Sequence, residues 1–457
     1  MKEKVSDIYP LTPMQEGMLL YSVMNPSSSA YFKQTTFYIN DELNPDIVVK
    51  CLNEIISRYD ILRTAFVHEN TTKTFQVVLK NRNIEFEQYN IVGYNKVEKE
   101  DFIKKYKEKD KNLGFNLTKD ILFRVTVIQT DIKEYVLLWS HHHIIMDGWC
   151  VSIILKEFNT LYKSSLENKP VKLPKVIQFN SYIKWLMAKD KEVAINFWKD
   201  YLHGFSQPSL LEDGIKISTE QYNRKVHFHI LDRSLTKGMR NVISSEGLTL
   251  NTIIHAVWSI ILKIYTGKND VLFGYVVSGR PPEIRGIETM LGIFINTLPV
   301  RVNFNDVVSL KDLLKNLKEN LLNCEPYHYF PLTEIWANSQ LQRDFFDNFI
   351  TFENLPRQQE NSGYDQSLNI NKIESYEQSS YNFNLIVHPS EEITLEFKFN
   401  ANLYSFQFIE TISKHFNEVA EILVNNLNYP VNDIKLSHNK EKVNVNLSDY
   451  SDTDFRI

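Results

Sequence analysis

Hydrophobic positions along the chain follow two spacings, which predicts strands and helices mixed throughout. Residues 34–40 alternate apolar and polar side chains, as a half-buried strand does. Asn44 can then cap a helix with Pro45 at its first position, and residues 45–58 carry apolar side chains on one face. We expect two strand pairs in this part of the chain, formed by residues 64–67 with 74–79 and 121–129 with 135–141.

The second half of the chain repeats this mixture of elements without visible sequence repetition. One helix rich in aromatic residues is predicted over residues 179–202, and Thr249 can cap another that is closed by Gly267. Further helices are expected near residues 309–324 and 405–425, and strands near 271–277, 348–353, 381–388 and 393–400. These patterns predict an α/β or α+β fold.

A stretch without periodicity, residues 164–176, carries Asn168, Pro170 and Pro174 and is the best linker candidate. The 457 residues are enough for two or three folding units. We therefore predict an N-terminal lobe over residues 1–170 and a C-terminal lobe over residues 171–440. The polar residues 441–457 resemble the start of a linker to a following domain.

Composition excludes several classes of protein. The chain is 43% hydrophobic and 23% charged, as globular domains are, and its net charge of −5 with scattered lysines argues against a nucleic-acid partner. No apolar run approaches the roughly 18 residues that a membrane span needs, and no signal segment is visible, so we expect a cytoplasmic protein. The three cysteines, Cys51, Cys150 and Cys324, are expected to be buried reduced thiols.

Polar chemistry is concentrated in residues 140–150, which read SHHHIIMDGWC between a strand-like and a helix-like apolar segment. Because strand side chains alternate, His141 and His143 should share one face and His142 the other, which disfavours a metal bound by all three. A lone histidine is more often a hydrogen-bonded residue near the core. The Asp147-Gly148 pair at a strand-to-helix junction instead favours a catalytic site.

Several motifs in this order resemble the condensation domains of non-ribosomal peptide synthetases. The family signature His-His-x-x-x-Asp-Gly is met at residues 142–148 (HHIIMDG). Further matching motifs are residues 9–19 (YPLTPMQEGML), 58–66 (RYDILRTAF), 182–186 (YIKWL), 292–299 (GIFINTLP) and 328–332 (HYFPL). The resemblance covers essentially the whole chain.

The resemblance implies two lobes, each similar to chloramphenicol acetyltransferase, that form a V-shaped pseudo-dimer with the active site between them. It implies peptide-bond formation between two thioesters on phosphopantetheine arms. The arms belong to a donor (upstream) and an acceptor (downstream) carrier domain, which enter from opposite mouths of a tunnel. An adenylation domain is expected in the same synthetase, and the chain itself should need no cofactor or metal.

By the same resemblance, His143 is the essential catalytic histidine and His142 supports it. Aminolysis of a thioester needs a positioned amine lone pair, an outlet for the amine proton and stabilisation of the developing oxyanion. An α-amine has a reference pKa of about 7.7–8.0, so positioning by His143 could account for much of the effect. Asp147 could orient His143, but we favour an architectural ion pair with an arginine, with Arg58 as first choice and Arg280 as second.

Gly148 is expected to matter by its lack of a side chain, which keeps space for substrate. Trp149 and Cys150 depart from the serine that often follows the glycine, and they resemble the subclass that joins a D-configured donor to an L-configured acceptor. Trp149, Asn296 and His328 are candidates for the substrate tunnel. Arg63 and Trp198 also belong to matching motifs, and each also has a structural alternative; a tryptophan on a helix is more often a packing residue than a catalyst. Leu332 replaces the phenylalanine that is usual in the last motif.

Two alternatives stay open at this level. An epimerisation domain has the same fold and histidine motif but is expected to need an additional carboxylate facing the histidine, for which the sequence shows no convincing motif. A non-catalytic docking module is the other alternative, although degeneration in such modules usually reaches the histidine motif, which is intact here. A heterocyclising relative would carry aspartates in place of the paired histidines.

Overall fold

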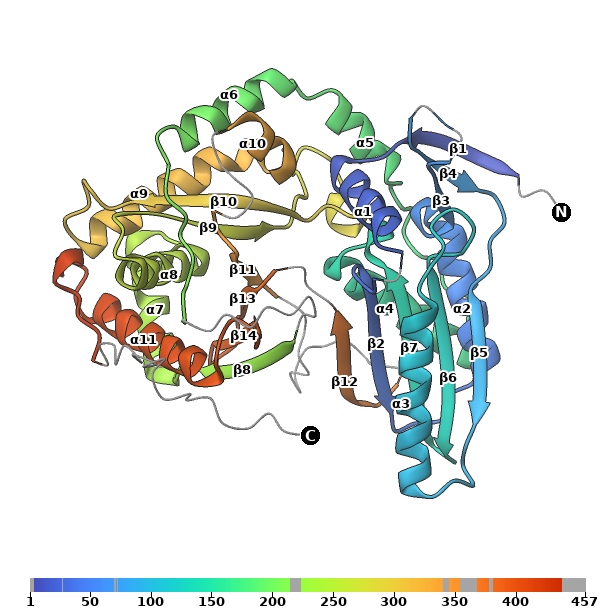
Figure 1. The fold of residues 1–457 in the computed structure, drawn as a ribbon. Coiled ribbons are helices and arrows are strands. Elements are labelled where there is room, and N and C mark those ends of the chain that lie inside the picture. The colour runs from blue at the N-terminus through green and yellow to red at the C-terminus, as the bar shows by residue number, and fades with distance from the viewer. Residues whose placement is uncertain are drawn as a thin grey trace, which may run out of the picture. The chain divides into compact units, whose positions relative to one another are not determined.

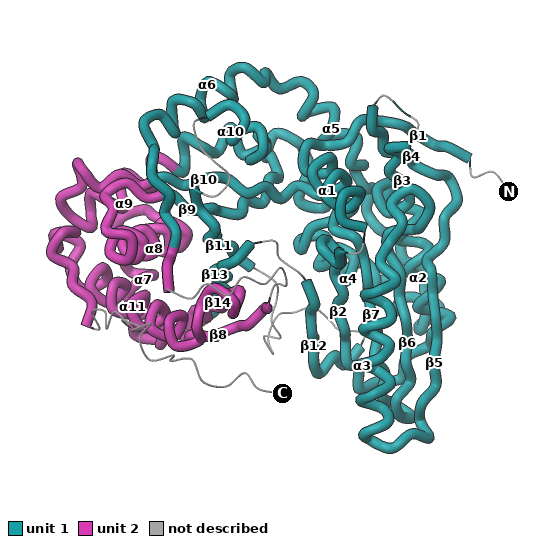
Figure 2. Tube along the Cα trace, in the orientation of Figure 1, with its two compact units in different colours: residues 1–210, 272–301, 321–390 teal, residues 211–271, 302–320, 391–457 magenta. Residues whose placement is uncertain are grey.

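The computed structural model describes residues 4–26, 28–69, 71, 73–213, 223–339, 345–353, 368–377 and 381–437. It divides the chain into two compact units, coloured in Figure 2. Unit 1 comprises residues 1–210, 272–301 and 321–390, and unit 2 comprises residues 211–271, 302–320 and 391–457. The boundary that we predicted near residue 170 stays a prediction, and residues 441–457 lie outside the described residues.

A five-stranded sheet in unit 1 carries the His-rich run. Its order is β12-β2-β7-β6-β5, formed by Ile370–Glu377, Phe32–Ile39, Glu134–His142, Phe123–Asp131 and Glu85–Asn90. The paired strands that we expected near residues 121–141 are β6 and β7, which run antiparallel. The expected pairing of residues 64–67 with 74–79 is confirmed as well, since β3 (Thr64–Val67) pairs antiparallel with β4 (Phe75–Leu79). Strand β4 also pairs with β1 (Val5–Pro10).

Helices cover both faces of this sheet, so β6 and β7 are buried almost along their whole length. Ile128 and Leu138 pack in a cluster with Tyr106 of α3 (Lys96–Leu113). The alternate residues Val127 and Leu137 point to the opposite face, where α2 (Pro45–Arg58) and α4 (Gly148–Leu166) lie. Two buried faces explain why these strands show long apolar runs in the sequence.

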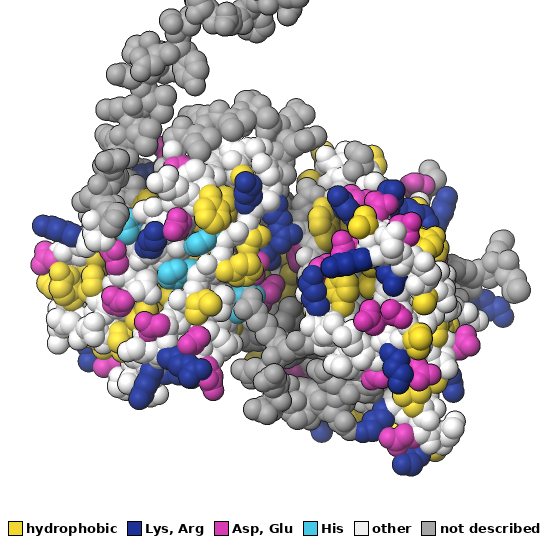
Figure 3. All heavy atoms as spheres, turned by 90° about the horizontal axis from the view of Figure 1, so that it is seen from below, with side chains coloured by type: hydrophobic (Ala, Val, Ile, Leu, Met, Phe, Trp, Pro, Cys, Tyr) yellow, Lys and Arg dark blue, Asp and Glu magenta, His cyan; other side chains and the backbone are white. Residues whose placement is uncertain are grey.

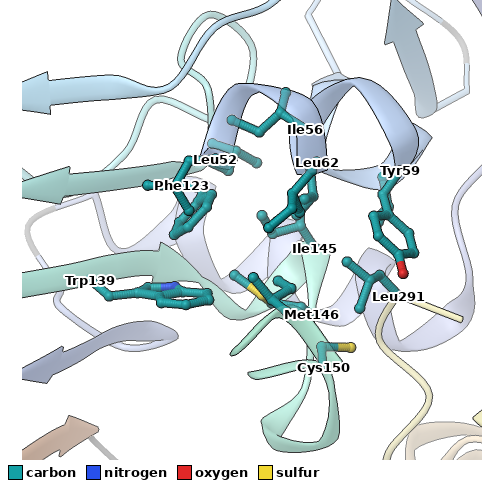
Figure 4. Close-up of a cluster of buried hydrophobic side chains, with 14 of the residues drawn as sticks. Leu52, Ile56, Tyr59, Leu62, Phe123, Trp139, Ile145, Met146, Cys150 and Leu291 are labelled. Atoms are coloured by element: carbon teal, nitrogen blue, oxygen red, sulfur yellow. The ribbon is translucent and has the colours of Figure 1, made fainter. Parts of the chain in front are cut away.

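The main core of unit 1 lies directly behind the His-rich run (Figure 4). Phe123 of β6 and Trp139 of β7 pack with ring centroids 4.7 Å apart. Leu52 and Ile56 of α2 approach the same cluster, together with Met146. The turn after β7 is therefore held against rigid packing, which is what a precisely placed imidazole requires.

Helix caps lie where the sequence predicted them. The Asn44 side chain accepts from the backbone N–H of Asp46 and Ile47 at the start of α2, and Thr249 caps α8 (Leu250–Thr266). Gly267 ends α8 in the left-handed conformation with φ 68°. A glycine adopts this backbone without the steric cost that a Cβ would add.

One prediction in this region is wrong in detail. The single helix expected over residues 179–202 is two helices, α5 (Asn180–Met187) and α6 (Lys191–Leu202). Asp190 breaks the helix because its carboxylate accepts from the N–H of Glu192 and Val193 and caps α6. The preceding connection between α4 and α5 contains no helix or strand, as expected for most of residues 164–176.

The remaining described elements of unit 1 include a second set of strands. Strands β10, β9, β11 and β13 lie in this order, and β11 runs parallel to β9 and β13. The bounds are Asn296–Asn303, Asp270–Val277, Asn348–Phe352 and Phe383–His388 for these strands, and Pro13–Met24 for α1 and Leu332–Asn338 for α10. Short 3-10 turns are η1 (Asp60–Arg63), η2 (His143–Ile145), η3 (Ile287–Thr289) and η4 (Glu325–Tyr327).

Unit 2 pairs strand β14 (Thr394–Asn400) antiparallel with β8 (Arg224–Ile230). Its helices are α7 (Arg233–Glu246), α8, most of α9 (Leu310–Cys324) and α11 (Phe406–Asn425), followed by η5 (Val431–Asp433). The helices and strands that we expected near residues 309–324, 393–400 and 405–425 are thus present. The mixed α/β class is confirmed.

The sequence analysis missed strand β12, which matters for the site. It pairs antiparallel with β2 over Ile370 to Glu377, and Figure 1 shows it beside β2 at the edge of the sheet. Its side chains are mostly exposed or half-buried, so it lacks the apolar alternation by which strands are recognised. The strand brings residues from late in the chain close to the histidines of the His-rich run.

The surface carries charges of both signs. Figure 3 shows basic and acidic side chains interspersed over one face, in agreement with the scattered lysines of the sequence. Within the described residues, no single helix is long and apolar enough to cross a membrane. The helices α7 and α8, bent by 112°, pass that test only as a pair and only by length and composition.

Candidate active site

The His-rich run turns sharply where the sheet ends. Strand β7 ends at His142, the turn η2 begins at His143, and α4 starts at Gly148. The backbone N–H of His143 donates to the carbonyl of Tyr31 at 2.8 Å, which ties the turn to the start of β2. The His143 residue is only 6% exposed, so its orientation is fixed by protein contacts.

Both ring nitrogens of His143 have a partner. Nδ1 lies 3.2 Å from the carbonyl oxygen of Met146, and Nε2 lies 3.1 Å from Oε1 of Glu377. Since a carbonyl oxygen only accepts, the first contact is a hydrogen bond when Nδ1 carries the proton. Nε2 is the ring nitrogen that faces the Glu377 carboxylate.

Strand register brings Glu377 to this place. Glu377 is directly opposite Lys33 in the β12–β2 pairing, and Lys33 is directly opposite His141 in the β2–β7 pairing. The Lys33 Nζ lies 3.0 Å from Oε2 of Glu377, so the two carboxylate oxygens contact the lysine and His143 separately. The rings of His141 and His143 lie 5.7 Å apart, on the shared face that strand alternation predicted.

Electrostatics separate the roles of these groups. Burial raises the pKa of Glu377, but the charge of Lys33, with further contributions from its hydrogen bond and from His143, lowers it more, so its pKa lies well below the usual range. Burial lowers the pKa of Lys33, and the Glu377 carboxylate outweighs this effect and raises it. Burial also lowers the pKa of His142 to about 3 and that of His141 well below its usual value. Those two imidazoles are therefore neutral at neutral pH.

Asp147 forms the architectural ion pair that we expected, but with our second choice of arginine. Its Oδ1 lies 3.3 Å from Nη2 of Arg280, and neither side chain is more than 5% exposed. Arg58, our first choice, instead binds Glu157 of α4 through two hydrogen bonds of 3.0 and 3.1 Å. Sequence proximity to a family motif did not reveal which arginine is close in space.

The Asp147 carboxylate is fully buried and has further donors. It accepts from the backbone N–H of Cys150, which caps α4, and from the N–H of Phe294 at 3.2 Å. Arg280 donates from Nη1 to the carbonyls of Ile287 and Met290. Asp147 is thus occupied in joining the start of α4 to residues 280–294, while the His143 ring is held by Met146 and Glu377, which supports architecture over a triad role.

Gly148 is the first residue of α4, and its surroundings are open. A Cβ placed on Gly148 would meet no atom within 4 Å, and its φ is not in the left-handed region. Neither backbone conformation nor packing therefore requires glycine at this position. The next residue, Trp149, is 46% exposed and donates from Nε1 to the Glu288 carbonyl at 3.0 Å.

A pocket of about 480 Å³ lies beside Trp149 and Arg280. Its lining also includes Ser278, Pro282, Ile284, Arg285, Gly286, Ile287 and Glu288. Cys150, whose neighbour Trp149 lines this pocket, is fully buried, and its thiol contacts the Asp147 carboxylate and the Gly292 carbonyl. The three cysteines are all buried and free, as the sequence analysis expected.

Several other candidates make mainly structural contacts. Arg63 is buried and donates to the carbonyls of Ile56 and Leu79 and to Asp60. Asn296 donates from Nδ2 to the carbonyls of His328 and Phe330 at 2.9 and 2.7 Å, and Trp198 is a core residue of α6. Burial lowers the pKa of His328 to about 4. A tunnel role for Asn296 and His328 stays a prediction.

Lys33 and Glu377 are the site residues that the sequence analysis missed. Glu377 lies 234 positions after His143, and neither residue belongs to a motif that we recognised. Recognising strand β12 in the sequence would have placed Glu377 on the sheet, but its polar side chains do not alternate as those of a half-buried strand do. Among the described residues, no group of three His, Cys, Asp or Glu side chains could hold a metal ion.

Comparison with known proteins now defines the class to which this fold and site belong. The sequence model of the Condensation domain family matches residues 5–445. The chain therefore belongs to the condensation domains of non-ribosomal peptide synthetases, and its fold is their fold of two chloramphenicol-acetyltransferase-like lobes.

Among individual relatives, the chain is 35% identical over 443 residues to surfactin synthase subunit 3 of Bacillus subtilis (strain 168), covering 96% of this chain and 35% of that protein. It is 34% identical over 445 residues to bacitracin synthase 3 of Bacillus licheniformis, covering 96% of this chain and 7% of that protein. The chain thus spans only a part of these relatives' length.

Solved structures agree on the fold. The starter condensation domain of rhizomide synthetase aligns with a TM-score of 0.76 at 17% identity, covering 94% of this chain and 100% of that one. The X-domain from teicoplanin biosynthesis aligns with a TM-score of 0.78 at 16% identity, covering 95% and 99% of the two chains.

Proposed function

We propose that this chain forms a peptide bond between two substrates carried as thioesters on the phosphopantetheine arms of separate carrier domains. The amine of the acceptor attacks the donor thioester carbonyl, and the thiol of the donor arm leaves. The observation that carries the proposal is the placement of His143, whose imidazole is held by Met146 on one nitrogen and presents the other beside an ionised carboxylate. The family assignment supports the same activity.

His143 acts in this proposal through its Nε2 atom. Holding the amine at attack distance from the carbonyl converts a bimolecular step into an effectively unimolecular one, which is the larger contribution. Accepting or orienting the amine proton contributes typically about 10²–10⁴-fold. The chain itself supplies no cofactor in this scheme, since the phosphopantetheine arms and the following adenylation domain belong to other parts of a synthetase that works in the cytoplasm.

The donor is proposed to end in a D-configured residue. This rests on the resemblance of Trp149 and Cys150, after the glycine, to the subclass that accepts such donors. The exposed Trp149 ring beside a pocket of about 480 Å³ is compatible with a role in reading the donor. Offering the chain two peptidyl carrier domains that differ only in the configuration of the last residue tests this point, and a preference for the L-donor would overturn it.

A second candidate function is favoured by one specific observation. Glu377 faces His143, and an epimerisation domain is expected to use an additional carboxylate facing the histidine. Removal of an α-proton, however, needs a carboxylate of raised pKa, whereas the ion pair with Lys33 holds the pKa of Glu377 well below its usual range. This makes Glu377 a poor base and favours condensation.

One incubation separates the two functions. The chain is mixed in deuterated water with one carrier domain loaded with a dipeptidyl donor and another loaded with an aminoacyl acceptor. Mass spectrometry of the two carrier domains should show the extended peptide on the acceptor carrier. Deuterium at the α-carbon of one substrate without amide formation would contradict condensation and support epimerisation. If neither the extended peptide nor the deuterated substrate forms, the result would support a docking role.

A further inference from the structure

The pairing of Glu377 with His143 needs a third partner when His143 works as a proton acceptor. With Nδ1–H donating to Met146, the neutral ring turns the Nε2 lone pair toward Oε1 of Glu377, 3.1 Å away. Two acceptors at this distance repel each other unless a proton or a cationic donor lies with them. When Nε2 carries no proton, a small positively charged hydrogen-bond donor satisfies both acceptors.

Lys33 keeps the carboxylate ionised without filling this place. It contacts Oε2 of Glu377, leaving Oε1 directed to His143, and its position is fixed by the cross-strand register between β12 and β2. The Lys33 side chain is 9% exposed, whereas the Glu377 side chain is 41% exposed. The lysine is thus a buried support, and the carboxylate side chain is partly exposed.

The acceptor substrate carries a group of the required kind. An α-amine with a reference pKa of about 7.7–8.0 is mostly an ammonium at pH 7, although only the neutral amine can attack a thioester. A single ammonium nitrogen can donate one hydrogen bond to a carboxylate and another to an imidazole nitrogen about 3 Å away. The Nε2–Oε1 pair offers both acceptors to one nitrogen.

The geometry points to Glu377 as the residue that binds the ammonium of the acceptor aminoacyl group and places it against Nε2 of His143, with Lys33 as its positioning residue. This inference rests on the proposed condensation function. The ammonium gives one proton to His143, and the freed amine attacks the thioester carbon. The C–N bond forms, the C–S bond breaks, the second amine proton ends on the thiol sulfur, and His143 releases the first to solvent.

Two other titratable groups near Glu377 do not compete for the ammonium. His141 on β7 is neutral because burial lowers its pKa, and Asp147 at the start of α4 is paired with Arg280. Glu353, after β11, acts electrostatically on Lys33 in the same sense as Glu377. The described groups that act electrostatically on Lys33, His141 or Glu377 are thus Lys33, His141, His142, His143, Asp147, Glu353 and Glu377 themselves.

The test compares two acceptors that differ only in the reacting group. The whole chain is assayed with one peptidyl carrier domain and with an acceptor carrier loaded either with the amino acid it uses best or with the matching 2-hydroxy acid. A hydroxyl cannot become a cation. Glu377→Gln should lower kcat/KM for the amino acceptor about 10- to 100-fold, mainly through KM, because one charge-assisted hydrogen bond is lost. Ester formation with the hydroxy acceptor should change less than about threefold.

Matched variants keep the result interpretable. Glu374→Gln removes a carboxylate from the same strand that pairs with Lys107 and Lys372, and it should leave both acceptors unchanged. Glu377→Asp keeps the carboxylate charge but places it farther from His143 because the side chain is shorter. Compared with Glu377→Gln, it should restore part of the preference for the amino acceptor. Equal loss for both acceptors in Glu377→Gln, or no loss for either, would overturn the ammonium site. Failure of the wild-type chain to form any amide would overturn the proposed function instead.

Discussion

Oδ1 of Asp147 lies 3.3 Å from Nη2 of Arg280, and both side chains are buried. This pair joins the residue that caps α4 to a segment more than 130 positions later. Because α4 starts shortly after the turn that holds His143, we expect the pair to support the site and not to take part in its chemistry. The Asp147 of the motif is thus explained by its structural contacts, whereas folding does not require Gly148.

Removing one member of this pair should destabilise the fold. Asp147→Ala leaves a buried guanidinium without its carboxylate, and we expect a loss of about 3–5 kcal/mol in the free energy of unfolding measured by urea. Arg280→Ala should cost a similar amount. Arg58→Ala, which breaks a more exposed pair with Glu157, should cost clearly less. Equal losses for Arg58 and Arg280 would contradict the assignment of the partner.

The stability of the fold should decrease as the pH falls below about 6.5. His142 is neutral in the folded state because burial lowers its pKa to about 3, whereas the unfolded chain takes up a proton near the reference value. The unfolded state therefore binds more protons between these two pKa values and is stabilised relative to the folded state. This single group should reduce the free energy of unfolding by about 1 kcal/mol between pH 7.5 and pH 5.5.

His142→Asn tests the origin of that pH dependence. The asparagine amide oxygen can take the place of Nδ1, which accepts from the N–H of Ile144, but it does not titrate. Urea unfolding at pH 7.5, 6.5 and 5.5 should therefore give a flatter profile for the variant, with the contributions of the other buried histidines, among them His141, His255 and His328, remaining. An unchanged slope would show that His142 is not the group responsible.

Gly148→Ala should separate substrate space from folding. The added Cβ meets no protein atom within 4 Å and the backbone is not left-handed, so thermal stability should be unchanged or slightly higher. If the open space belongs to the substrate, amide formation should fall by about 100-fold, since small displacements of reacting groups are costly. Gly93→Ala, where a Cβ also meets nothing, is the control. Full activity of Gly148→Ala would refute a role for this space.

Local sequence signals predicted much of the fold. Asn44 and Thr249 cap helices where expected, and β6, β7 and α4 surround the His-rich run as the apolar spacing indicated. Local signals failed where tertiary pairing decides. Strand β12 has few buried side chains, so it shows no apolar alternation, and its place beside β2 depends on backbone pairing with a distant segment.

The candidate site shows the same division. Strand alternation predicted that the side chains of His141 and His143 lie on one face of the sheet. Their rings are 5.7 Å apart, although His143 already belongs to the turn η2. The choice between Arg58 and Arg280, and the presence of Lys33 and Glu377, depend on contacts between residues far apart in the chain, which one sequence without its relatives does not encode in any readable pattern. The carboxylate that we missed now distinguishes the possible functions of the site.

The central claim is that this chain forms a peptide bond and that His143 is required for it. The most direct measurement is amide formation by His143→Ala, with two loaded carrier domains as substrates and the exposed His203→Ala as a matched control. Thermal melting should show both variants folded. Loss of the extended peptide in His143→Ala alone is the result that we predict, and an unchanged yield of that peptide would contradict the account.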